Sequence, residues 1–229
     1  MLKKICFLVF FLCLIFLQNV DAQEFYNISA KFSIKEKQLD GQNVLVMGKV
    51  YYDQKYRKVV YDIQFPTPEV WVIADTVFCK YVGGKRIEKQ TIAAINQYSV
   101  FHLALTGQLQ NFGLARSAYR LQSSENQGEN LVSTWLPPTS AKRFFFGKIL
   151  TQQKQKRLSG VVVFDAKNVV LQKQLFANYQ QIKGLSFPSE ITQVTYNDKG
   201  AAFYKKTTFS EIRVNDSANK KMYNFGLER

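Results

Sequence analysis

The sequence contains very little of the chemistry from which catalytic sites are usually built. Its single histidine, His102, has no second histidine and no cysteine cluster to complete a zinc site. No serine lies in a G-x-S-x-G motif, and the glycines at Gly83-Gly84-Lys85 lack the spacing of a phosphate-binding loop. We therefore predict a binding protein, not an enzyme, without metal or cofactor, in which His102 is structural or exposed. Two carboxylates brought together from separate strands would leave a hydrolase as the alternative.

Acidic residues are also scarce, with 17 Asp and Glu against 31 Lys and Arg, a formal net charge of +14. Such a chain favours nucleic acid, an anionic membrane surface or an acidic ligand as its partner. The basic residues are scattered along strand-like segments and do not cluster in a recognition helix. We predict an anionic lipid surface and no nucleic acid.

Only one long apolar run is present, at residues 5–17, after Lys3 and Lys4 and before the small-residue pattern Val20-x-Ala22. A spanning helix needs about 20 apolar residues, so the run is short for a retained membrane anchor, which is the alternative. We predict a signal peptide, residues 1–22, and a single exported domain, residues 23–229. Because Cys13 lies within the apolar run, a lipidated mature N-terminus is not expected, and the mature chain is predicted to be soluble.

Cysteine is nearly absent once the predicted signal peptide is removed. Cys6 and Cys13 leave with it, so Cys79 remains alone and no internal disulfide is possible. Lying in an apolar strand pattern, Cys79 is predicted to be a buried small hydrophobic residue. The net charge falls from +14 to +13, because Lys3, Lys4 and Asp21 are lost.

Strand patterns fill most of the remaining chain. Residues 42–85 predict four consecutive strands, since β-branched and aromatic residues are interrupted by short turn sequences. Further strands are predicted at residues 27–35, 117–124, 131–136, 143–152, 158–166, 169–177, 190–197 and 201–215. About eleven or twelve short strands at regular spacing indicate an antiparallel barrel or curved sheet.

Residues 42–85 are unusually apolar on both faces. Residues 58–65 read as an ordinary amphipathic strand, whereas 44–52 and 70–73 are apolar on both sides. Strands of this kind need cover on both faces, from another layer or from helices.

A helical pattern replaces the strand pattern between residues 90 and 114. Ala94, Tyr98, Phe101 and Leu105 recur at helical spacing, with Asn96 or Ser99 as N-cap and Gly107 as the stop; Leu109, Phe112 and Leu114 suggest a second short turn. The hydrophobic period fits a helix packed permanently on the core and equally a movable lid. The polar tail, residues 217–229, is predicted to be loose.

The order of these elements resembles the periplasmic lipoprotein carrier family LolA, in a divergent form typical of Bacteroidetes. The resemblance covers nearly the whole mature chain. It rests on GKVYY (48–52), YDIQFP (61–66), Ala74-Asp75 and FCKY (78–81), and later on LPP (136–138), VVVFD (161–165) and LSFPSEI (185–191).

The resemblance implies an unclosed antiparallel β-barrel of about 11 strands with a short helical lid. It also implies a monomeric periplasmic carrier that shields the acyl chains of lipoproteins between an inner-membrane release complex and an outer-membrane acceptor. The alternatives are a carrier of another amphiphile, or a regulatory module on the same fold that senses lipid or lipoprotein. The predicted lining of the apolar cavity, where ordinary core packing is the competing role, is Val46, Val50, Tyr52, Val59, Tyr61, Ile63, Val72, Phe101 and Leu105.

Two features depart from the family pattern. The mature chain enters its first strand almost at once, where LolA proteins have a helix. The Arg-Pro pair that follows the glycine strand in the family is replaced by Gln54-Lys55, with Arg57 nearby. The family arginine's role in ligand release is therefore not assigned to any residue.

Overall fold

A single antiparallel sheet dominates the computed structural model, which describes residues 24–38, 40–92, 99–138 and 146–226. The predicted signal peptide lies outside these residues. The thirteen strands of the described residues are β1 (Asn27–Lys37), β2 (Asn43–Asp53), β3 (Lys58–Phe65), β4 (Glu69–Ala74), β5 (Val77–Val82), β6 (Lys85–Thr91), β7 (Arg120–Gln127), β8 (Asn130–Leu136), β9 (Phe146–Lys154), β10 (Arg157–Asp165), β11 (Val170–Ile182), β12 (Leu185–Tyr196) and β13 (Ala202–Val214).

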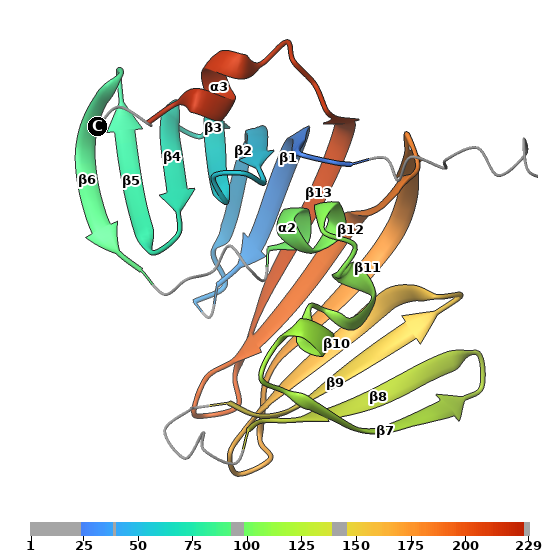
Figure 1. Cartoon of the computed structure of the whole chain (residues 1–229). Helices are drawn as coiled ribbons and strands as arrows, with labels where there is room; N and C mark the ends of the chain where they lie inside the picture. Colours follow the sequence, from blue (N-terminus) through green and yellow to red (C-terminus); the bar gives the residue numbers. More distant parts are fainter. Residues whose placement is uncertain (1–23, 39, 93–98, 139–145, 227–229) are drawn as a thin grey trace, which may run out of the picture.

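The strand order shows that the sheet is not closed. Strands β6 to β1 follow one another in reverse order, and β1 then pairs with β13, from which the order descends to β7. Strands β6 and β7, consecutive in the chain, are therefore the two free edges. Figure 1 shows the sheet curving around the short helices that connect these edges. The predicted unclosed antiparallel barrel with a short helix is confirmed.

The strand predictions hold best where side chains are apolar. The four strands predicted in residues 42–85 are β2 to β5. Strand β6 was not predicted, because all seven of its side chains are exposed and the edge strand has no hydrophobic period. Strand β12 begins at Leu185, five residues before the prediction, since Pro188 interrupts the pattern expected of a strand.

Close approach between β2 and β3 requires glycine at position 48. A Cβ atom there would collide with the carbonyl oxygen of Asp62. The register between the two strands shifts at the same point, between Met47 and Gly48. A bulge of this kind bends the strand and increases its twist, so the glycine of the GKVYY motif serves the curvature of the sheet.

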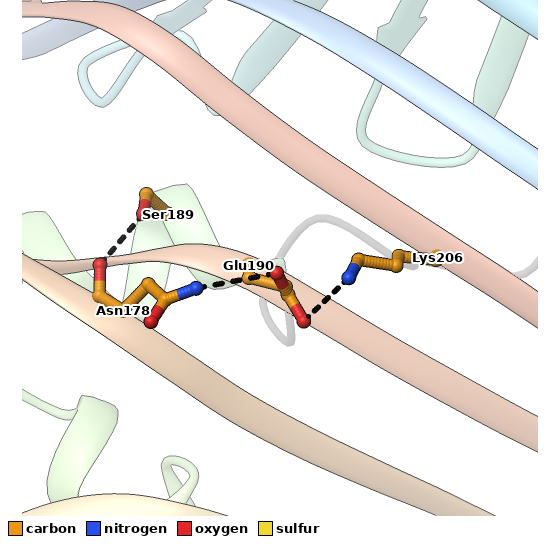
Figure 2. A network of polar contacts seen from close by, with 4 residues as sticks. All are labelled: Asn178, Ser189, Glu190 and Lys206. Atoms are coloured by element: carbon orange, nitrogen blue, oxygen red, sulfur yellow. Dashed lines mark hydrogen bonds and ion pairs between the residues drawn. The ribbon is translucent and has the colours of Figure 1, made fainter.

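A polar network secures another irregular point, between β11 and β12 (Figure 2). Asn178 has a left-handed backbone (φ 54°), and Pro188 on β12 has no N–H to donate. The Ser189 hydroxyl donates to the Asn178 carbonyl oxygen (2.6 Å), and the Asn178 side-chain amide donates to Glu190 (3.2 Å). Glu190 also pairs with Lys206 on β13 at 2.8 Å, so three strands are tied together here.

Each face of the sheet carries its own hydrophobic cluster. The larger one joins the inner face, which we define as the face bearing Phe32, Tyr52 and Phe187, to helix α2 (Val100–Leu105) and the short 3-10 turns η2 (Leu109–Asn111) and η3 (Leu114–Arg116). The smaller one lies on the opposite, outer face and contains Tyr51, Val60, Val72, Cys79 and Tyr223. The cover predicted for both sides of these strands is present.

The outer cluster is covered by the chain's C-terminal segment. Helix α3 (Lys220–Asn224) contacts β2 and β3 and lies away from α2 in Figure 1. Tyr223 is buried and meets the ring of Tyr51 edge-to-face, with 5.7 Å between centroids. The prediction of a loose tail is therefore wrong for its described part, up to residue 226. The segment was predicted to be loose because most of its residues are polar, although its few apolar side chains pack on the outer cluster.

The same cover explains an error in β3, which was predicted to be amphipathic. Its Lys58 and Val60 are buried on the outer face, while Phe65 at the strand end is exposed. The Lys58 amine donates to the carbonyl oxygen of Phe225 (3.0 Å), just after α3. Burial lowers the pKa of Lys58 to about 8. The face of β3 that carries Lys58 is therefore partly buried, which the amphipathic pattern did not indicate.

Candidate functional site

Helix α2 has clear local start and stop signals. Ser99 has an extended backbone, and its hydroxyl accepts the His102 N–H (3.2 Å), which makes it the N-cap. Gly107 follows the C-cap with a left-handed backbone (φ 67°). The predictions of Ser99 as N-cap and Gly107 as stop are confirmed. Ala94, Asn96 and Tyr98 lie outside the described residues.

Helix α2 is held on the inner face by aromatic packing. The Phe101 ring is stacked with those of Tyr52 and Phe187, at centroid distances of 6.1 and 5.7 Å, and meets Phe209 edge-to-face at 5.3 Å. Leu103 and Leu105 are buried beside it. Apolar packing of this kind stabilises the position of α2 through the area that it removes from water.

A polar contact also joins α2 to the sheet. The Tyr52 hydroxyl and His102 Nδ1 are 2.7 Å apart. Burial lowers the pKa of His102, and the nearby Arg57 lowers it further, so the neutral imidazole is favoured. Burial raises the pKa of Tyr52. The predicted structural role of His102 agrees with this contact.

The predicted cavity residues fall into three groups. Those buried in the inner cluster are Val50, Tyr52, Val59, Ile63, Phe101 and Leu105. Val46 and Tyr61 are partly buried against the same cluster. Val72 lies in the outer cluster, so it is not a neighbour of the others. Ligand contact at the inner-face positions stays a prediction.

The strand register explains the error at Val72. In β4 successive side chains alternate between faces, and Val72 pairs with Val60, an outer-face residue. Ile73 pairs with Val59 and packs against the inner cluster instead. Because 70–73 is apolar throughout, its sequence does not show which residues face inward.

One stretch of the inner face, away from α2, combines apolar and charged side chains. Trp71 packs against the inner cluster, and its indole N–H donates to Glu69 (2.8 Å). Lys80, paired with Trp71 across the sheet, forms an ion pair with Glu69 at 2.6 Å. Phe78 meets the Trp71 ring at 6.0 Å. This polar group was not predicted, because the pairing of β4 with β5 is what brings Lys80 to Glu69 and Trp71.

A pocket of about 550 Å³ opens beside α2. It lies between the segment from α2 to η2, the β9–β10 turn and the β11–β12 turn, with lining residues that include Leu105, Leu109, Arg157, Tyr179 and Leu185. Its size falls within the range of pockets for small ligands, about 300–1,000 Å³. Leu105 is the only predicted cavity residue that lines it. The remaining lining residues come from segments far apart in the sequence, among them the β9–β10 and β11–β12 hairpins.

Other sequence predictions concern particular residues. Cys79 is a free, buried cysteine, as predicted. Within the described ranges, no cluster of three or more His, Cys, Asp or Glu side chains is placed to hold a metal ion. None of the helices described is both long and apolar enough to cross a membrane.

Comparisons with known proteins define the fold. The sequence matches no family model and no curated protein. Three solved structures share the architecture over most of both chains. A DUF1329 family protein from Desulfovibrio piger has a TM-score of 0.62 at 11% identity, covering 92% of this chain and 93% of that one.

Two other solved structures, a LolA superfamily protein and a lipoprotein-sorting domain, share the fold. A LolA superfamily protein from Nitrosomonas europaea has a TM-score of 0.57 at 12% identity, covering 88% and 90%. A domain assigned as an outer membrane lipoprotein-sorting protein from Vibrio parahaemolyticus has a TM-score of 0.60 at 14% identity, covering 88% and 91%. The chain therefore has a LolA-like fold, and the predicted resemblance is confirmed at that level.

Proposed function

We propose that this protein is a periplasmic carrier that binds the acyl chains of lipoproteins on the inner face of its sheet. The observation that carries the proposal is the combination of a LolA-like fold with an apolar inner face covered by the short helix α2. In this view the protein acts by binding and not by catalysis. It receives its cargo from a release complex at the inner membrane, delivers it to an acceptor at the outer membrane, and works as a monomer.

The energetics favour a carrier of this design. Each methylene removed from water contributes about 0.8 kcal/mol, so an acyl chain binds tightly to an apolar surface without covalent chemistry. Phe101, Leu103 and Leu105 of α2 are buried against the inner face of the sheet. Displacing them would expose the inner cluster to the chain, while Val46 and Tyr61, already partly exposed, extend that surface.

The direct test is to purify the protein from its native envelope, extract it with organic solvent and identify bound lipid by mass spectrometry. The protein is then added to inner-membrane vesicles loaded with labelled lipoprotein, and soluble lipoprotein is measured. We expect bound acyl chains and release of lipoprotein as a soluble complex. An empty protein that also fails to release lipoprotein would refute the proposal.

A matched pair of variants locates the binding surface. Val46→Arg places a charge on the partly buried inner face, whereas Val169→Arg makes the same change at a position 58% exposed. We expect Val46→Arg to abolish release and Val169→Arg to leave it unchanged, with circular dichroism confirming that both variants fold. Equal release by the two variants would exclude the inner face as the site.

A further inference from the structure

The pocket beside α2 is divided into an apolar floor and a basic mouth. Its buried floor residues are Ala104, Leu105, Leu109, Leu158 and Leu185. Lys156 and Arg157 are exposed at its edge, and none of its lining residues is acidic. The pocket therefore offers an amphiphile an apolar surface and a positive charge within one site.

The two basic side chains are placed by the β9–β10 turn. Gln155 and Lys156 both have left-handed backbones, with φ of 50° and 59°, and Arg157 begins β10. The Arg157 guanidinium carbon lies 5.5 Å from the centroid of the Tyr179 ring, a cation–π arrangement. The Tyr179 hydroxyl donates to the Leu158 carbonyl oxygen (2.7 Å), which fixes the ring.

Lys156 and Arg157 have no acidic partner in the described part of the chain. The ion pairs found there are Lys31–Glu211, Lys80–Glu69, Lys154–Glu129 and Lys206–Glu190. A guanidinium held by a ring face keeps its N–H donors in a planar fork that matches carboxylate and phosphate oxygens. The charge at the mouth is thus available to an anionic group.

The wall beside the mouth is tied to the turn. The Gln110 side chain, in η2, donates to the Lys156 carbonyl oxygen (2.7 Å), and the Gln153 side chain donates to the Gln110 carbonyl oxygen (3.1 Å). The distance between the apolar floor and the basic mouth is therefore set by the fold before any ligand arrives. Preorganisation of this kind lowers the entropic cost of binding.

We propose that this pocket binds an anionic lipid, with the acyl chain against the leucines and the carboxylate or phosphate head at Lys156 and Arg157. The inference rests on the proposed function and deepens it, because it names the charge of the head group that the carrier prefers. Charge complementarity and the apolar floor together favour a lipid over a free anion, which would leave the leucines uncovered.

The test compares two ligands with the same chain and different heads. A polyene fatty acid, whose fluorescence rises in apolar surroundings, and the alcohol of the same chain are titrated into the exported protein at neutral pH and low salt. We expect the acid to bind about tenfold more tightly, corresponding to about 1.4 kcal/mol. The preference should shrink with added salt, because exposed charges are screened. A lysophospholipid with an anionic phosphate head should displace the acid, and inorganic phosphate should not.

The chain offers a closely matched control for the charge. Lys156→Gln with Arg157→Gln removes the basic mouth, and Lys85→Gln with Arg86→Gln removes a Lys-Arg pair that is also exposed, on edge strand β6. We expect the first double variant to lose the preference for the acid while still binding the alcohol. The second should keep the preference.

The outcomes separate this inference from the proposed function. Equal binding of acid and alcohol by the unaltered protein would overturn the head-group site and leave acyl-chain binding intact. Equal loss in both double variants would also overturn it, since net charge and not the pocket would then be responsible. Displacement by inorganic phosphate would show a free-anion site instead. Binding of neither ligand would refute the pocket as a lipid site and count against the carrier function itself.

Discussion

Tyr223→Ala tests whether α3 is an integral cover of the outer face. Tyr223 is 4% exposed and packs on Tyr51, while the outer cluster below it also contains Val72 and Cys79. Truncation of a large buried aromatic residue to alanine costs about 3–5 kcal/mol. We expect a loss of about 3 kcal/mol, at the lower end, because a five-residue terminal helix can detach locally and so limit the effect.

Two measurements quantify this effect. Denaturant unfolding gives the global loss, with Tyr204→Ala, at a tyrosine 52% exposed, as a control expected to change stability by less than about 0.5 kcal/mol. Cys79, the only thiol in the predicted exported chain, reports local opening. A loss of about 3 kcal/mol should accelerate its chemical labelling roughly 100-fold. Unchanged labelling together with unchanged stability in Tyr223→Ala would show that α3 does not protect the outer cluster.

Three further predictions concern titration and backbone packing. Burial lowers the pKa of His102 in the folded protein, so the unfolded chain binds more protons in acid. The unfolding free energy should therefore fall as pH drops below about 6.5, and this fall should be smaller in His102→Gln. The pKa of Lys58 is about 8 in the folded protein, below its unfolded value, so the free energy of unfolding should rise as pH increases from 8 toward about 10.5. In Lys58→Met, denaturant unfolding over the same pH range should show no such rise in the free energy of unfolding. Gly48→Ala should destabilise the fold by about 1–3 kcal/mol in thermal unfolding, because the new Cβ collides with the Asp62 carbonyl oxygen. Gly160→Ala, whose Cβ would meet no atom closer than 3.7 Å, should cost less, and equal losses would contradict the steric explanation.

Sequence patterns were sufficient for much of the architecture because the relevant forces are local. Alternating apolar side chains predicted most strands, and Ser99 and Gly107 marked the start and end of α2 through N-capping and left-handed backbone preferences. Doubly apolar strands correctly indicated that both faces of the sheet are covered. Edge strand β6 escaped prediction because an exposed strand is held by backbone pairing and not by a hydrophobic pattern.

The tertiary structure decides which apolar side chains face the inner cluster and which face the outer cluster. Where 70–73 is apolar throughout, pairing with β3 alone turns Ile73 inward and Val72 outward. The polar segment 217–226 is held because Tyr223, with Met222 and Phe225 beside it, packs on the outer cluster, and buried Lys58 donates to the Phe225 carbonyl oxygen just after α3. The pocket beside α2 likewise joins turns that are distant in the chain. The sequence by itself determined most of the strands, the helix limits and the need for two covers, since these depend on neighbouring residues. The face to which each apolar side chain points, the cover of the outer face by α3 and the pocket beside α2 depend on contacts between residues far apart in the chain. Only the folded sheet creates these contacts.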